Sequence, residues 1–207
     1  MEWKPFTLDN VIYDLSHLDP FNLSITIPPK KDKPEQSYLL KVNFGLHCFS
    51  RKSKKGESIP RKLAYSDSRE TRIFDMDRYE QSKLLPDIVK RIASQKCFQD
   101  GHGKFYVVKI VDADGVQRYY SVFFALSKAG KGSALNLFII TAHMRDIMPY
   151  AHKLKPIRFD VLVYNTKTKK AIKPARQKTK GPARSLLNRT LLEYSTLGCE
   201  PFLASCC

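Results

Sequence analysis

The chain is 207 residues long, carries 36 lysines and arginines against 20 acidic residues, and has a formal net charge of +16. Hydrophobic residues make up 43% of it, which excludes a wholly disordered chain. The longest apolar stretch is far shorter than the roughly 20 residues that span a bilayer, and the N-terminus lacks the apolar run of a signal peptide. We therefore expect a cytoplasmic protein with no membrane partner.

The excess of positive charge repels itself unless a polyanion neutralises it. Nucleic acid is the commonest such partner in cells, so the composition predicts a nucleic-acid-binding protein. An anionic membrane surface and a basic tail with no specific ligand are the alternatives. The five cysteines are odd in number and lack disulfide spacing, which fits free thiols in a reducing compartment.

The first fifty residues are predicted to form short strands. Phe6–Leu8 and Val11–Leu15 flank the turn Asp9-Asn10. Phe21–Ile27 alternates apolar and polar residues, and Tyr38–Phe49 does the same over a longer run. Both patterns are typical of strands with one buried face.

A basic connector and two helical segments are predicted next. Arg51–Arg61 is rich in lysine and has little to bury, so we expect a flexible link. A helix should begin near Asp77, with Asp75 or Asp77 as its cap. A second segment should cover Pro86–Ser94, and its apolar stripe consists of Leu85, Ile88, Val89 and Ile92.

Four consecutive strands are predicted in the second half of the chain. Lys104–Asp112 and Gln117–Ser127 flank Ala113-Asp114-Gly115, a hairpin turn signal. Leu135–Arg145 and Arg158–Asn165 supply the third and fourth strands. A helical segment followed by three or four antiparallel strands is an α+β arrangement, with one sheet face on the helix and the other partly open.

The C-terminal region is strongly basic. Residues 161–192 contain nine lysines and arginines and no acidic residue, which predicts a mobile basic arm. The expected organisation is therefore an N-terminal β region (1–50), a basic connector (51–76), a helix with an antiparallel sheet (77–166) and a basic tail (167–207).

A row of reactive side chains is predicted at the end of the third strand. Alternation along Leu135–Arg145 puts Thr141, His143 and Arg145 on one face, roughly 7 Å apart. His143 is the candidate acid or base of a metal-independent RNA cleavage, and Arg145 would bind the phosphate. Tyr119 or Tyr120 would stack on a base or donate a proton. The predicted core face of this strand consists of Phe138, Ile140, Ala142 and Met144. The alternative is an ordinary sheet histidine with a solvated arginine.

Aromatic and basic residues interleave on the predicted strands and continue into the basic tail. Aromatic platforms flanked by cations suit single-stranded nucleic acid, although ordinary cross-strand pairing explains the same tyrosines. The candidate nucleic-acid-binding residues are Lys104, Tyr106, Arg118, His102, Lys128, Lys131, Lys167, Lys169, Lys170 and Arg176.

Two further clusters are open alternatives. His47-Cys48 with Cys97 and His102 offers zinc ligands, but the spacing fits no zinc finger and buried cysteines are ordinary core residues. Asp100–Lys104 is a glycine-containing turn that could present amides to a phosphate, although it is not a Walker motif. We expect neither a metal centre nor a cofactor.

Several short segments resemble a known family. They are Trp3-Lys4-Pro5-Phe6, Tyr13-Asp14-Leu15-Ser16-His17-Leu18, His47-Cys48-Phe49 and Gly101-His102-Gly103. They are similar to small bacterial proteins of mobile elements labelled stationary phase growth adaptation proteins, over most of residues 1–146. The resemblance implies a bacterial cytosolic setting in toxin–antitoxin or phage-defence biology, and it transfers no catalytic residue. The order of helix and strands over residues 77–165 is also similar to RelE and barnase-type ribonucleases.

These observations predict an RNA-directed nucleic-acid-binding protein, with His143, Arg145 and Tyr120 as candidate catalytic residues of a ribonuclease. The alternative is a non-enzymatic nucleic-acid-binding or adaptor protein of a mobile-element or defence system. An acidic protein or antitoxin is a candidate partner in either case.

Overall fold

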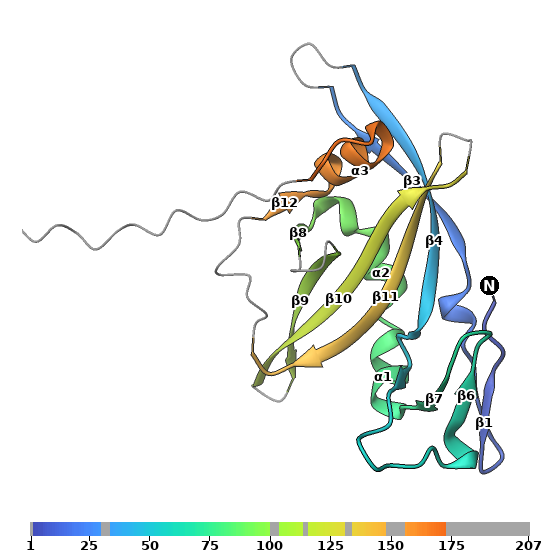
Figure 1. Ribbon diagram of the computed structural model, residues 1–207. Helices are drawn as coiled ribbons and strands as arrows, with labels where there is room; N and C mark the ends of the chain where they lie inside the picture. Colours follow the sequence, from blue (N-terminus) through green and yellow to red (C-terminus); the bar gives the residue numbers. More distant parts are fainter. Residues whose placement is uncertain are drawn as a thin grey trace, which may run out of the picture. The chain divides into compact units, whose positions relative to one another are not determined.

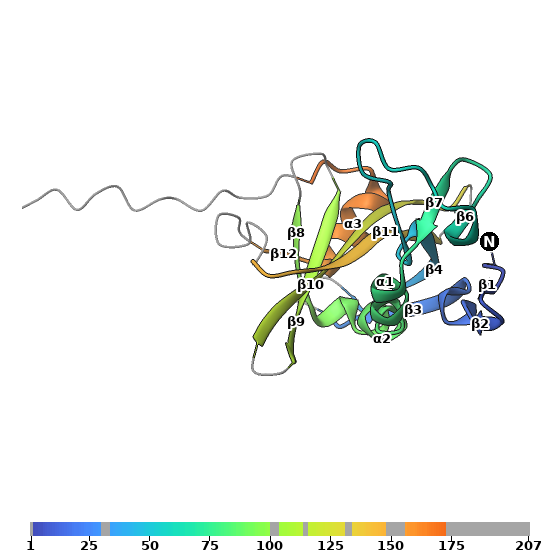
Figure 2. The same ribbon diagram turned by 90° about the horizontal axis from the view of Figure 1, so that it is seen from below.

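The computed structural model describes residues 2–29, 34–99, 104–113, 116–130, 134–147 and 156–172, with Asp112, Ala113 and Val116 described by their backbone alone. These residues form a mixed α+β structure built on a curled, mostly antiparallel sheet (Figures 1 and 2). The seven strands of this sheet run in the order β12-β8-β9-β10-β11-β4-β3, and β4 and β11 are its parallel pair. Their bounds are β3 Phe21–Ile27, β4 Gln36–His47, β8 Lys96–Gln99, β9 Phe105–Ala113, β10 Val116–Lys128, β11 Leu135–Arg145 and β12 Ile157–Arg158.

Two smaller sheets and the helices complete the described structure. A hairpin joins β1 (Phe6–Leu8) to β2 (Val11–Tyr13), and the order β5-β7-β6 forms a three-stranded sheet. The remaining bounds are β5 Ser50–Arg51, β6 Ala64–Ser66, β7 Thr71–Phe74, α1 Met76–Ser82, α2 Leu85–Lys90 and α3 Phe159–Thr168, with short 3-10 helices η1 Ser16–Leu18, η2 Arg61–Leu63 and η3 Ile92–Ser94.

The predicted alternation of the N-terminal strands matches the observed core. On β4, Leu40, Val42, Phe44 and Leu46 are all buried. At the β1–β2 turn, Asp9 and Asn10 both have positive φ, as a tight hairpin turn requires. β3 and β4 belong to the main sheet, because β3 pairs with β4 and β4 pairs with β11.

The stretch predicted as a flexible connector is partly folded. Arg51 pairs with Glu57 over 2.7 Å, and β5, β6 and β7 form their small sheet between residues 50 and 74. An aromatic cluster holds this sheet against the N-terminal hairpin, with the rings of Phe6 and Phe74 stacked at 4.0 Å. The sequence prediction missed β7, whose residues Arg72, Ile73 and Phe74 are buried.

The predicted helix start is confirmed. Asp75 is the N-cap of α1, and its Oδ1 accepts a hydrogen bond from the backbone N–H of Arg78. The apolar stripe of the second segment is buried throughout, although that segment divides into α2 and η3.

The predicted fourth strand, Arg158–Asn165, is wrong. β12 covers only Ile157–Arg158, and the chain then enters α3. Phe159, Leu162 and Val163 are buried at the three- and four-residue spacings of a helix, and Phe159 packs on Phe124 of β10. This helical face outweighs the strand preference of the β-branched and aromatic residues in the segment.

The predicted core face of β11 is also wrong at Phe138 and Ile140. Leu135, Leu137, Ile139 and Ala142 are buried, whereas Phe138 and Ile140 lie on the opposite face. A β-bulge at Ile140 causes the change, because Phe124 pairs with Ile139 and Phe123 pairs with Thr141. Beyond the bulge the alternation changes phase, so Thr141, His143 and Arg145 do share the face away from the core.

Candidate functional site

Polar side chains gather where β4 and β11 separate. The two strands pair regularly up to Phe44 and Ile139, and the pairing becomes irregular and ends at His47 and Thr141. Side chains from both strands, from β5 and β7 and from α1 meet around this point. We call this set the junction site, and it comprises His47, Ser50, Glu70, Arg72, Arg78, Thr141, His143 and Arg145.

Arg78 lies at the centre of the junction site. Its Nη1 donates to the carbonyl oxygens of His47 over 3.1 Å and Ser50 over 2.9 Å. The Oγ1 of Thr141 donates to the same His47 carbonyl over 3.4 Å. Burial lowers the pKa of Arg78, and among the described residues it forms no ion pair. A partly buried guanidinium therefore lies at the junction with no salt bridge among the described residues, although the charge of nearby Asp75 acts on it.

The one carboxylate of the junction site is engaged elsewhere. Glu70 Oε1 lies 2.6 Å from Nε2 of His47, and Glu70 Oε2 lies 3.4 Å from Nη1 of Arg72. The hydrogen bond with His47 is the main reason that the pKa of Glu70 is lowered. Arg72 is buried and also donates from Nε to the hydroxyl of Ser50. Glu70 thus interacts with His47 and Arg72, and it forms no salt bridge with Arg78 or Arg145.

His143 and Arg145 form a direct pair on the face away from the core. The Nε–H of Arg145 donates to Nε2 of His143 over 3.1 Å. Both groups contact Phe123, whose ring stacks on His143 at 5.8 Å and lies 5.6 Å from the Arg145 guanidinium carbon. Among the described residues, Arg145 forms no ion pair. Its Nη groups are therefore available to an anion.

The environment of His143 favours the neutral imidazole. Burial, followed by the charges of Arg145 and Arg78, lowers the pKa of His143 to about 4. Because Nε2 accepts from Arg145, the ring proton of the neutral form belongs on Nδ1. That Nδ1 is buried and has no hydrogen-bond partner in the described part of the chain. His143 at neutral pH therefore has no proton to release at Nε2 and a lone pair already engaged.

Rings from four neighbouring strands line up beside this pair. Phe98 stacks on Tyr106 at 5.5 Å, Tyr106 lies 5.1 Å from Phe123, and Phe123 stacks on His143. Phe98 and Tyr106 are only 7% and 3% exposed, so their end of the row is closed to ligands. The end that a ligand can approach is formed by Phe123, His143 and Arg145.

Tyr120 does not belong to this face. Its side chain is fully buried among the core residues, and burial raises its pKa. The proposed role of Tyr120 in stacking or proton donation is therefore a wrong prediction, because no substrate could reach it. Tyr119, the other candidate, pairs with Arg145 across β10 and β11 and is partly exposed.

The predicted nucleic-acid-binding residues do not form a single patch. Arg118 is exposed near one end of β10 and Lys128 at the other, roughly 33 Å away at strand spacing. Tyr106 is buried within the ring row, and Lys104 is exposed just before β9. The remaining described candidates lie at the end of α3, where Lys167 lies over Tyr38, Lys170 over Tyr164, and Lys169 follows the helix.

Three candidates, His102, Lys131 and Arg176, fall outside the described residues, as does most of the predicted arm and of the Asp100–Lys104 turn. Within the described ranges, no group of three or more His, Cys, Asp or Glu residues is placed to hold a metal ion. Cys48 and Cys97 are buried free thiols, and burial raises the pKa of each to about 12.

The sequence reasoning missed Arg72 and Arg78. The sequence marks Arg78 only as the third residue after the cap Asp75, and no alternation marks Arg72, because Arg72, Ile73 and Phe74 are buried in succession. Glu70 and Arg72 lie in a stretch of mixed charge that resembles a solvated surface. Only the pairing of β4 with β11, which are far apart in sequence, brings these groups to His143.

The fold and site define an α+β protein with a curled mixed sheet and a cationic junction between its parallel strands. The chain matches the model of the YjaZ family over residues 5–167, and it belongs to that family. This range includes every residue of the junction site. No curated protein and no solved structure matched the chain. Among the described residues the longest helix is α3, with ten residues, and none of the helices there has the length and apolar character needed to cross a bilayer.

Proposed function

We propose that the chain is an RNA-directed nucleic-acid-binding protein that holds single-stranded RNA at the junction site. One observation carries this proposal: the positive charges of both Arg145 and Arg78 act on His143, and neither guanidinium forms a salt bridge among the described residues. Guanidinium groups with free donors suit phosphate oxygens, which they bind bidentately. A phosphate would add negative charge beside these two guanidinium groups.

The aromatic side of the site favours a base next to that phosphate. Phe123 and the His143 ring are parallel within 9°, and the Arg145 guanidinium lies against the same Phe123 ring. Unpaired bases stack on aromatic rings and on guanidinium planes, whereas paired bases in a duplex are not free to do so. This geometry therefore supports a single-stranded ligand.

Binding without cleavage is the form of this function that we propose. Metal-independent cleavage of RNA needs a base for the 2′-hydroxyl and an acid for the leaving oxygen. His143 is neutral at pH 7, and its Nε2 accepts from Arg145, so it fits neither role in the described arrangement. Tyr120 is out of reach in the core. These observations favour the hypothesis of a non-enzymatic nucleic-acid-binding protein over the hypothesis of a ribonuclease.

A cytosolic setting belongs to the same proposal, because Cys48 and Cys97 are unpaired thiols in the core. The proposal also includes a mobile-element or defence context, whether toxin–antitoxin or another kind. This part rests only on the resemblance of short segments to small bacterial proteins of mobile elements.

The proposal is tested by fluorescence anisotropy with a labelled 20-nucleotide single-stranded RNA, the matching DNA and an RNA duplex. We expect micromolar or tighter binding of the single strands at low salt, with RNA ahead of DNA and duplex, and a steep loss of affinity with added salt. The RNA should remain intact on a gel after incubation, with and without chelator. Absence of binding to all three ligands in dilute buffer would refute the proposal, and cleavage without metal would restore the ribonuclease.

A further inference from the structure

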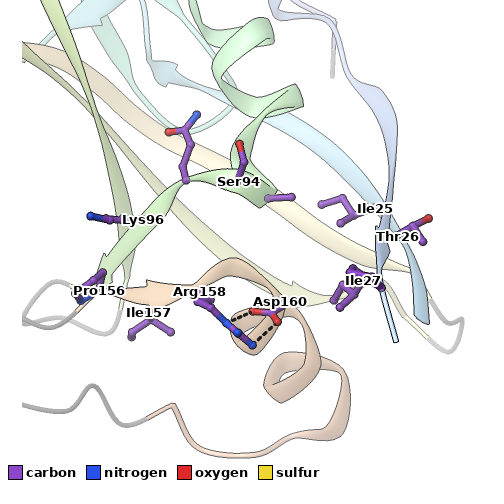
Figure 3. Close-up of a pocket in the computed structure, with 12 residues that line it drawn as sticks. Ile25, Thr26, Ile27, Ser94, Lys96, Pro156, Ile157, Arg158 and Asp160 are labelled. Atoms are coloured by element: carbon purple, nitrogen blue, oxygen red, sulfur yellow. Dashed lines mark hydrogen bonds and ion pairs between the residues drawn. The ribbon is translucent and has the colours of Figure 1, made fainter. Parts of the chain in front are cut away.

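A groove separates the two end strands of the main sheet. The strand order leaves β3 at one end and β12 at the other. A cavity of about 390 Å³ is lined by residues 25–28 at one end and by residues 93–96 and 156–158 at the other (Figure 3). A second cavity of about 280 Å³ continues along α3 and shares Ile27, Pro28, Arg158 and Asp160 with the first. We call the two cavities together the edge groove.

The edge groove offers unpaired backbone. β3 pairs only with β4 and β12 only with β8, so each has an edge with no strand beside it in the described structure. Such an edge presents N–H and C=O groups to any extended chain. β3 has seven residues and β12 two, so β3 is the longer template. Small barrels close with about eight strands, so one added strand would bring this seven-stranded sheet to that number.

The walls of the edge groove suit the side chains of such a strand. Ile25 and Ile27 of β3 line the first cavity together with the apolar groups of Ala93, Pro156 and Ile157. Strands that add to a sheet edge gain affinity from backbone hydrogen bonds and specificity from pockets for alternate side chains. Apolar residues at every second position of an incoming segment would meet these walls.

The positive charge of the edge groove favours acidic residues between the apolar residues of the incoming segment. Lys96 and Arg158 lie directly opposite each other in the pairing of β8 with β12, and like charges in that position destabilise a sheet. Arg158 is compensated by Asp160, whose Oδ2 lies 2.6 Å from its Nη2. Lys96 forms no ion pair in the described part of the chain. A carboxylate on an added strand would therefore relieve an existing repulsion.

We propose that the edge groove accepts an extended acidic segment of a partner protein, which adds to β3 as a further strand. RNA fits this groove less well, because its lining is largely apolar and includes the carboxylate of Asp160. The groove begins where Ile27 pairs with Gln36, whereas the junction site lies beyond His47 at the other end of β4, roughly 36 Å away. The two sites are thus separate and can be tested separately.

The test uses the full chain labelled with ¹⁵N and, as probe, a blocked nonapeptide in which valine alternates with glutamate. We expect the peptide to change the chemical shifts of the backbone amides of Ile25, Ile27, Lys96 and Ile157. It should also slow the hydrogen exchange of the amides along β3. A peptide of the same sequence with alternate backbone amides N-methylated should not bind, since it cannot complete the edge. Lys96→Glu should weaken binding at least roughly fivefold by placing like charges together. Lys128→Glu, with the same change of charge outside the groove, should leave binding within about twofold.

Four results would overturn the proposal. The first is no change in the chemical shifts of the groove amides when the peptide is added, and the second is equal affinity for the methylated and unmethylated peptides. The third is an equal loss of peptide affinity in Lys128→Glu and Lys96→Glu. The fourth is a change in the chemical shifts of these amides caused by an oligouridine probe but not by the peptide. Lys96→Glu should fold, because the new carboxylate faces Arg158 across β8 and β12. RNA binding at the junction site is measured by anisotropy without the peptide, so each proposal can fail alone.

Discussion

The Nε–H of Arg145 donates a hydrogen bond to Nε2 of His143 over 3.1 Å, and both side chains lie against the ring of Phe123. This contact fixes the imidazole as an acceptor and keeps a positive charge beside it. The pair therefore opposes protonation of the histidine while keeping the Nη groups of the arginine open to a ligand. For this reason we expect the site to bind an anion rather than to transfer a proton.

The dependence of the free energy of unfolding on pH should show that the site opposes protonation of His143. The pKa of His143 is about 4 in the folded chain and about 6.5 in an unfolded one, so the unfolded chain takes up the proton first. The contribution of neutral His143 to stability is complete above pH 6.5 and is lost as the pH falls through 4. We expect an NMR titration midpoint near 4 for His143. When the pH falls from 7 to 4.5, the free energy of unfolding should decrease less for His143→Gln than for the wild type. A midpoint near 6.5 would contradict this account of the site.

The buried hydroxyl of Tyr120 distinguishes the ribonuclease hypothesis, in which Tyr120 acts on the RNA, from the binding hypothesis, in which it does not. It has no hydrogen-bond partner among the described residues, and the ring is fully buried. Removing an unsatisfied buried group costs little, so Tyr120→Phe should change the free energy of unfolding by less than about 1 kcal/mol, in the stabilising direction if at all. RNA affinity should be unchanged. A large loss of affinity in a folded Tyr120→Phe variant would return Tyr120 to the site.

The cap of α1 links stability to binding. Asp75→Ala removes the hydrogen bond to the N–H of Arg78, so it should destabilise the chain by about 1 kcal/mol and weaken RNA binding by loosening Arg78. Asp75→Asn keeps a capping oxygen while it removes a negative charge near Arg78. It should therefore retain the stability and bind RNA at least as tightly as the wild type. Urea unfolding and anisotropy measure the two effects, and weaker RNA binding by both variants would show that the charge of Asp75 matters more than its cap.

Gly45 allows β4 and β11 to approach at the junction. A Cβ at this position would lie 3.0 Å from the carbonyl oxygen of Ile140 and 3.1 Å from the Phe138 ring. Since the backbone of the bulge cannot give way freely, Gly45→Ala should destabilise the chain by about 1–3 kcal/mol in urea unfolding. Lys41→Ala, at an exposed position on the same strand, is the matched control and should change stability little. Equal stability of the two variants would mean that the bulge adapts.

Local signals in the sequence predicted the elements that depend on neighbours in the chain. The hairpin of β9 and β10, the Asp75 cap and the apolar face of β4 follow from turn residues, cap chemistry and alternation. The row of Thr141, His143 and Arg145 follows from the same alternation, since it lies wholly beyond the bulge at Ile140.

Contacts between distant segments decided the rest. The bulge at Ile140 depends on pairing with Phe123 and Phe124, and no local pattern marks it. The segment after Arg158 fits both a strand and a helix locally, and packing of Phe159 on Phe124 selects the helix. Arg72 and Arg78 reach the site only because β4 pairs with β11, so their role required the tertiary structure.

We expect the Nη groups of Arg145 to contact a phosphate of the bound RNA. The most direct test is the salt dependence of binding to the 20-nucleotide RNA for wild type, Arg145→Gln and Lys128→Gln. We expect Arg145→Gln to weaken binding and to reduce the slope of log affinity against log salt by about one. Lys128→Gln, which removes the same charge at the other end of β10, should change both quantities much less. Equal affinity and slope for Arg145→Gln and wild type would contradict the account.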